Sequence, residues 1–168
     1  MELNENWGNI KRLFKQSFRS SFHYAIATVS EQGEPHVTPI GSLILGDVGQ
    51  GMYFEEYPRQ LTRNLAKNKQ VCVLAVNSSP WFWLKSLIRG RFSEPPAVRL
   101  YGVVGEVREA TDKEIALLQR RVRKVSFTKG HAMLWKKMSK VRDVKFSRME
   151  PVLIGEMTRG TWSRHQME

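Results

Sequence analysis

The hydrophobic and polar positions across Phe22–Leu45 follow the pattern of a β-hairpin. Ala25–Val29 is short, apolar and rich in β-branched residues, which is typical of a strand. Ser30–Glu34 is a polar turn in which Gly33 can adopt a positive φ. A second strand follows at Pro35–Ile40, and its two prolines lack the N–H that a sheet ladder requires. We therefore expect the second strand to lie at the edge of a sheet.

Four other segments show helical patterns. Asn4–Phe18 and Arg59–Lys69 carry apolar residues three and four positions apart, so each has one apolar face. Thr111-Asp112-Lys113-Glu114 is a capping box, with a hydroxyl at the N-cap and a carboxylate three residues later, and it opens a helix that runs towards Val125. A further helix is predicted at Ala132–Met138. We expect these helices to pack outside the strands.

The remaining apolar runs have the length and composition of strands, and they lie at Met52–Glu56, Val71–Val76, Val98–Arg108, Val144–Phe146 and Val152–Ile154. Asn77–Ala97 is the least regular part of the chain. Its aromatic residues, Trp81, Phe82 and Trp83, would form core, a dimer contact or a lid over a ligand. The order of elements predicts an α+β domain, an antiparallel β-barrel of six to eight strands with peripheral helices.

Length and composition place few further limits on the chain. At 168 residues it fits one domain, residues 1–168. No apolar run approaches the roughly 20 residues that cross a bilayer, and the first residues lack the pattern of a secretory signal. The single cysteine, Cys72, rules out an internal disulfide and a Cys-based zinc site, and its apolar neighbours predict that it is buried. A cytoplasmic location is the default expectation.

The formal net charge of +11 calls for an explanation. Lysine and arginine are spread along the chain and are densest in Arg120–Lys145, which favours solvated basic helices. Phosphate binding or nucleic-acid binding are the alternatives. No helix-turn-helix, zinc or RNP-like pattern accompanies the charge, so nucleic acid is the less favoured partner.

Four motifs in sequence order resemble one known family. They are the hairpin with Gly33-Glu34-Pro35-His36-Val37-Thr38-Pro39-Ile40, then Met52-Tyr53-Phe54 with the following Asn64-Leu65-Ala66-Lys67-Asn68, then Tyr101–Val107, and last Val144–Phe146 with Pro151. Together they are similar to the pyridoxamine 5′-phosphate oxidase-like, FMN-binding split-barrel family. The resemblance implies an antiparallel split β-barrel and a homodimer that holds FMN between its protomers. It also implies an oxidoreductase of unspecified small-molecule substrate.

The resemblance also assigns candidate cofactor-binding residues. The ring of the flavin would lie on the second hairpin strand, largely against its backbone, at His36, Thr38, Pro39, Ile40 and Gly41. The phosphate end would lie at the third strand and the helix after it, at Phe54, Glu55, Arg59, Gln60, Thr62 and Arg63. Amide groups and the dipole at a helix start favour an anion, and an arginine fork can hold phosphate at two points. The alternative is that Arg59 and Arg63 are solvated helix residues and that His36 only flanks a turn.

The sequence departs from the family pattern near the expected phosphate. Glu55-Glu56 stands where members carry a hydroxyl, and Leu61 stands at the offset of a family lysine. Two carboxylates would repel a phosphate unless they point away or pair with arginine. Because strand neighbours point to opposite faces, only one can face the ligand, and we expect it to be Glu55.

No acid–base pair stands out, so catalytic residues are not identified, which suits an enzyme driven by its cofactor. Haem or a deazaflavin is the alternative ligand, with His36, His131 and His165 as conceivable iron ligands. The end of the chain, Trp162-Ser163-Arg164, is a poor match to the arginine motif of true pyridoxamine phosphate oxidases. A homodimer is expected also because Trp81, Trp83 and Trp135 exceed what a small barrel core uses.

Overall fold

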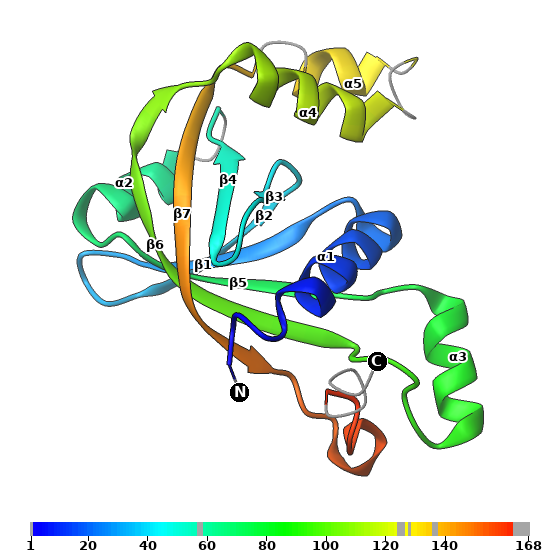
Figure 1. Cartoon of the computed structure of the whole chain (residues 1–168). Coiled ribbons are helices and arrows are strands. Elements are labelled where there is room, and N and C mark those ends of the chain that lie inside the picture. Colours follow the sequence, from blue (N-terminus) through cyan, green and yellow to red (C-terminus); the bar gives the residue numbers. More distant parts are fainter. Residues whose placement is uncertain (1, 57–58, 124–126, 128, 136–137, 163–168) are drawn as a thin grey trace.

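A computed structural model describes residues 2–56, 59–123, 127, 129–135 and 138–162 (Figure 1). Its helices are α1 Trp7–Ser21, α2 Arg59–Lys67, α3 Pro80–Arg89, α4 Asp112–Val122 and α5 Lys129–Leu134, followed by a 3₁₀ helix at Gly155–Thr158. Its strands are β1 Tyr24–Val29, β2 Pro35–Ile40, β3 Ile44–Leu45, β4 Gln50–Phe54, β5 Gln70–Val76, β6 Ala97–Glu109 and β7 Lys140–Pro151. Within the described residues these strands form one antiparallel sheet in the order β2-β1-β5-β6-β7-β4-β3.

The sheet curves because its two longest strands are irregular. The register of β6 against β7 shifts between Tyr101 and Gly102 and again between Val104 and Val107. At Gly102 a Cβ atom would collide with the backbone of Lys145, so only glycine permits this approach. Bulges bend a strand and increase its twist. As a result β6 and β7 sweep through both halves of the molecule, which Figure 1 shows as two long curved ribbons.

The core fills the inside of the curved sheet. α1 contributes Ile10, Leu13 and Phe14, and these pack with strand residues such as Ile26 of β1 and Val73 of β5, both 0% exposed. Leu61 and Leu65 of α2 and Leu118 of α4 join the same cluster. α1, α2 and α4 therefore bury the apolar faces that their spacing predicts. The α+β split-barrel class expected from the sequence is confirmed.

Several sequence predictions hold in detail. β2 lies at one edge of the sheet, as its prolines require, with Pro35 opposite Val29 and Pro39 opposite Ala25. Both hydrogen bonds of the capping box are present, since Thr111 accepts from the Glu114 N–H at 3.3 Å and Glu114 accepts from the Thr111 N–H at 2.8 Å.

Others are wrong. Asn77–Ala97 contains the regular helix α3, which begins after an N-cap at Ser79 and ends at Gly90 in the left-handed conformation. Val144–Phe146 is part of the longer strand β7, and Val152–Ile154 is not a strand. The helix predicted at Ala132–Met138 overlaps α5, which begins earlier and ends at Leu134, and residues 136–137 of that range lie outside the described residues.

Trp81 is 72% exposed, so of the alternatives raised for its segment it does not serve as core. Cys72 differs from expectation, because it is half-buried; that burial raises the pKa of its thiol. None of the helices in the described ranges has the length and apolar character needed to cross a membrane.

Candidate functional site

The predicted ring-binding residues lie along the edge strand β2 and just after it. His36 and Thr38 are half-buried and Pro39 is exposed, whereas Ile40 is 5% exposed and belongs to the core. A ligand at this edge can therefore meet only the backbone of Ile40. The fold itself favours glycine at position 41, because a Cβ there would lie 2.9 Å from the carbonyl oxygen of Phe22.

The sequence did not indicate the residue that closes the barrel beside this strand. Ser42 donates its hydroxyl to the carbonyl of Phe54 at 3.0 Å and accepts from the Phe54 N–H at 3.1 Å. Ser42 lies between β2 and β3, and β2 and β4 are near opposite edges of the sheet order. The two hydrogen bonds therefore tie the segment that follows β2 to the end of β4. Phe54 itself is 2% exposed, so its ring is part of the core.

Glu55 is held inside the protein. Its side chain is 2% exposed, and its carboxylate accepts hydrogen bonds from the Tyr53 hydroxyl at 3.3 Å, the Thr62 hydroxyl and Nε of Arg142. Arg142 also donates to the carbonyl of Gly105 at 2.9 Å. Burial, followed by the nearby Glu55 charge, raises the pKa of Tyr53. The expectation that Glu55 faces a ligand is thus not met, because its charge is neutralised by an arginine within the core.

Glu56 points the other way. It is exposed and accepts a hydrogen bond from the Ser139 N–H at 3.3 Å. The alternation expected of a strand end therefore separates the two carboxylates, with the inward one paired. The sequence led us to expect that Glu55 would repel a phosphate. Because Glu55 is paired with Arg142, that repulsion is removed.

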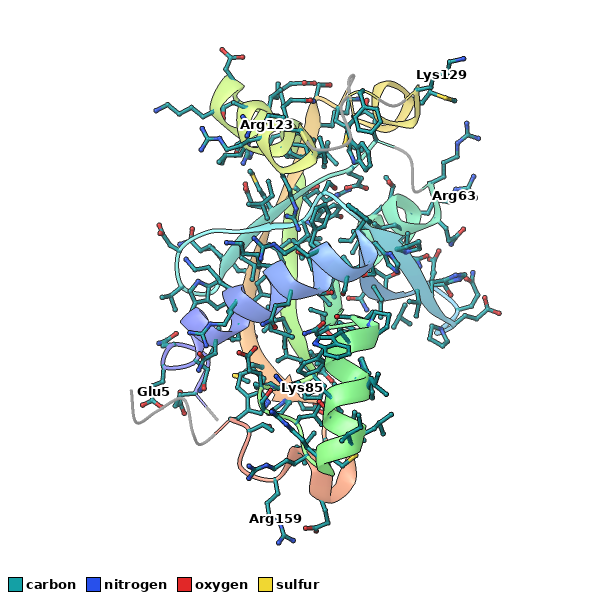
Figure 2. All side chains as sticks on the ribbon, turned by 90° about the vertical axis from the view of Figure 1, so that its right-hand side faces the viewer. Glu5, Arg63, Lys85, Arg123, Lys129 and Arg159 are labelled. Atoms are coloured by element: carbon teal, nitrogen blue, oxygen red, sulfur yellow. The ribbon has the colours of Figure 1, made fainter. Side chains whose placement is uncertain are left out.

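α2 presents its basic side chains to solvent beside the hairpin. Arg59 and Arg63 are exposed, lie one helical turn apart and form no ion pair with a described residue. Figure 2 shows Arg63 at the periphery of the molecule. Tyr57 and Pro58, which precede the helix, lie outside the described residues.

Hydrogen bonds fix α2 against the hairpin. Gln60 donates to the side-chain oxygen of Asn64 at 2.9 Å, and Asn64 donates to the Thr28 hydroxyl at 2.9 Å. Thr28 pairs with His36 across β1 and β2. The start of α2 and the His36 end of the edge strand therefore belong to one neighbourhood, whereas the side chains of Ile40 and Phe54 do not reach it.

The outward face of the sheet is a separate feature that the sequence did not single out. The strand register places Val37 of β2, Ala27 of β1, Cys72 of β5 and Tyr101 of β6 in one row. These residues are half-buried or exposed, and Val37 is 68% exposed. Neighbours on the opposite face, such as Ile26, are fully buried. The outward face is therefore apolar over β1, β2 and β5 but incompletely covered.

The remaining candidates are dispersed. The Trp83 indole donates to the Asn77 carbonyl at 2.7 Å and its ring packs edge-on against Phe92, so Trp83 fastens α3 to the segments before and after it. The side chain of His131 and all of His165 lie outside the described residues. Among the described residues, no three metal-ligating side chains come together.

Solved structures of low sequence identity share this fold. The haem-storage protein HutZ from Vibrio cholerae is 16% identical, with a TM-score of 0.55 over 90% of this chain and 95% of that one. An FMN-binding protein from Syntrophomonas wolfei is 12% identical, with a TM-score of 0.53 over 89% and 93% of the two chains. An F420 reductase is 14% identical, with a TM-score of 0.53 over 82% and 95%.

A match to a family model is more specific than a shared fold. Among curated proteins, none matches this sequence. The family model described as pyridoxamine 5′-phosphate oxidase matches residues 10–153, which include every strand of the sheet. The chain therefore belongs to the pyridoxamine 5′-phosphate oxidase family.

Proposed function

We propose that this protein is an FMN-binding flavoprotein that acts as an oxidoreductase on a small molecule. The observation that carries the proposal is the exposed pair of Arg59, at the start of α2, and Arg63, one turn later, beside the edge strand β2. Such a pair suits a phosphate monoester, because the helix dipole and the guanidinium forks would act on the same anion. The internal pairing of Glu55 with Arg142 supports it further, because no carboxylate charge from Glu55 is left to oppose a phosphate.

In this proposal β2 holds the ring system of the cofactor. An edge strand has backbone N–H and C=O groups that no neighbouring strand takes, and these can bind the polar edge of a flat heterocycle. His36, Thr38 and Gly41 are the partly open positions, and Pro39 is exposed beside them. The bound flavin would supply the electron transfer, while the chain binds and orients it.

We further propose that two copies associate through the outward face of the sheet. Ala25, Ala27 and Val37 present a small apolar surface on β1 and β2 that is only partly covered in a single chain. A two-fold contact on this face would also cover the edge strand at which we place the flavin. The cytoplasm is the proposed compartment, because a single cysteine allows no internal disulfide.

Haem and a deazaflavin are the competing ligands, because relatives of the same fold are an F420 reductase and a haem-storage protein. A deazaflavin would offer α2 a similar ring and anionic tail, whereas haem would need an axial ligand. Nucleic acid is less favoured, since the basic residues labelled in Figure 2 lie on separate parts of the surface, for example Arg63, Lys85, Arg123 and Arg159.

The test is reconstitution of the purified protein with FMN, a deazaflavin and haem in parallel, followed by gel filtration and a visible spectrum. We expect FMN to be retained in one equivalent per chain. Selective retention of haem, or no preference among the three, would overturn the proposal. Riboflavin serves as the control, since it has the ring without the phosphate and should bind more weakly by about tenfold or more.

A further inference from the structure

A cavity of about 720 Å³ lies between α1, α4 and β3, next to the Gly41 end of the proposed flavin site. Its volume is in the range of small-molecule sites. None of the residues predicted to bind the cofactor lines it. Its lining comes from α1, the residues that follow α1, β3 with the preceding Leu43, the end of α4 and Trp135.

The wall of the cavity is apolar and well ordered by ring contacts. Phe14 and Phe18 of α1 pack against Tyr24, with ring centroids 4.9 and 6.3 Å away. Phe18 also meets the ring of Phe22 edge-on at 5.8 Å. Leu43 and Val122 extend this surface from the other side. The cavity therefore suits a hydrocarbon or aromatic body.

Arg121 of α4 brings a charge into this apolar wall. Its guanidinium lies 3.8 Å from the centre of the Phe18 ring and donates to the carbonyl of Leu43 and the hydroxyl of Tyr24. Both partners are neutral, and within the described ranges no carboxylate pairs with it. Burial lowers the pKa of Arg121, which is the mark of a cation that lacks full compensation. A guanidinium has five N–H donors, so it can still bind an anion.

The rim of the cavity is positively charged, as Arg121 is. Lys11, Lys15 and Arg19 recur every four residues along α1 and are exposed, so they form one stripe at the edge of the cavity. None of them forms an ion pair with a described residue. The described lining contains four cations and no acidic residue. Such a rim raises the local concentration of anions.

The backbone conformation at the end of α1 is independent evidence that the cavity has a function. Phe22, at the C-cap, has φ 62°, the only positive φ of a non-glycine residue in the described structure. Glycine is the residue usually found in this conformation. The Phe22 side chain is 55% exposed, so core packing does not require the ring. A bulky aromatic held in a costly conformation at the mouth of a cavity is characteristic of a functional position.

We propose that this cavity binds an amphiphilic acid, a molecule with an apolar body and one carboxylate. The body lies among Phe14, Phe18 and Leu43, and the carboxylate is drawn by the α1 stripe and meets Arg121. The site is distinct from the one proposed for the flavin, and it assigns the protein a second, carboxylate-bearing ligand.

Calorimetric titration with dodecanoate below its micelle concentration tests the proposal. We expect one site per chain, with dodecanol binding at least about tenfold more weakly because it lacks the charge, and dodecyltrimethylammonium weaker still. Equal affinity for the acid and the alcohol, or many sites per chain, would overturn it.

Two variants locate the site. The double variant Lys15→Gln plus Arg19→Gln changes only exposed side chains and should weaken dodecanoate by about fivefold or more while leaving dodecanol unaffected. Arg12→Gln, an exposed residue of the same helix that does not line the cavity, is the matched control and should change neither. If the control and the double variant behave alike, the assignment is wrong. Saturating FMN should leave dodecanoate affinity unchanged, and direct competition would overturn the claim of a separate site.

Discussion

Arg142 of β7 forms an ion pair with Glu55, 87 residues earlier in the chain, and the two side chains are only 5% and 2% exposed. The pair joins the end of β4 to β7 inside the barrel, next to the start of α2. It also explains how a glutamate is accommodated inside the barrel at this position. Its negative charge is used within the fold and not presented to a ligand.

Breaking this pair should destabilise the protein severely. Removing one partner of a buried ion pair leaves an uncompensated charge, so Arg142→Met or Glu55→Gln should lower the free energy of unfolding by about 3–5 kcal/mol. The double variant Glu55→Gln plus Arg142→Met should recover a substantial part of that loss. Urea denaturation measures all three.

The exposed pair of Arg159 with Glu156 is the control, because both side chains are 78% exposed. Arg159→Met should change the free energy of unfolding by less than about 1 kcal/mol. Equal losses for Arg142→Met and Arg159→Met would contradict the burial argument. Strictly additive losses in the double variant would show that the two buried charges do not compensate each other.

The second prediction concerns the proposed phosphate site. Arg59→Ala plus Arg63→Ala should weaken FMN by more than about tenfold, because each lost charge-assisted hydrogen bond costs about 1.5–3 kcal/mol. Lys67→Ala is the matched control, since Lys67 is an exposed cation at the other end of α2. Flavin fluorescence gives both dissociation constants. An unchanged value in the double variant would place the phosphate elsewhere.

The sequence predicts local structure correctly at two places where the signal is local. Pro35 and Pro39 each remove a backbone donor, so the edge position of β2 follows from covalent structure alone. The hydroxyl of Thr111 and the carboxylate of Glu114 are three residues apart, so their capping box is visible in the sequence. Ser79-Pro80 and Gly90 equally mark the ends of α3. That helix was missed because its closely spaced aromatic residues obscured the helical period.

Long-range pairing could not be predicted in the same way. Arg142 sits between Val141 and Asp143 and looks like a solvent-facing strand residue, because the partner that neutralises it is distant in the chain. The cavity has the same origin, since Lys15, Leu43 and Arg121 come from three separate elements. Resemblance to the family supplied the fold and the candidate site residues, whereas the internal use of Glu55 depends on tertiary contacts.

Association of two chains gives the third prediction. Val37→Glu places a charge on the outward face of the sheet and should produce monomers, and FMN binding should fall with it. Val48→Glu is the control, since Val48 is 49% exposed in the turn between β3 and β4. Sedimentation velocity at micromolar protein measures the mass. A monomeric wild-type protein would contradict both the dimer and a shared flavin site.

Acid should weaken the attachment of α4. Arg108 bonds both Asp143 and Glu114, with contacts of 2.7 to 2.9 Å, and these bonds lower the pKa of Asp143 and lower that of Glu114 to about 2. A carboxylate whose pKa is lower in the folded state stabilises the fold at any pH above its ordinary pKa, which is 4.5 for Glu114. That contribution is lost as the pH falls from there through the folded-state pKa.

The midpoint of urea unfolding, followed from neutral pH down to about pH 2.5, should therefore fall in acid. Glu114→Gln keeps a hydrogen-bonding side chain in the capping box but cannot titrate, so its midpoint should start lower and fall less steeply. Identical slopes for the two proteins would show that Glu114 does not contribute to the pH dependence.

The last prediction separates the stability of α1 from ligand binding at its end. Phe22 holds a left-handed conformation that glycine adopts at no steric cost, whereas alanine retains the penalty. Phe22→Gly and Phe22→Ala both remove the ring contact with Phe18, so that loss cancels between them. The free energy of unfolding of Phe22→Gly should therefore be higher than that of Phe22→Ala by about 1 kcal/mol. Both variants should weaken dodecanoate equally, because both remove the same ring from the mouth of the cavity. Wild-type affinity in Phe22→Gly would show that the ring does not serve the ligand, and the strained conformation would then need another explanation.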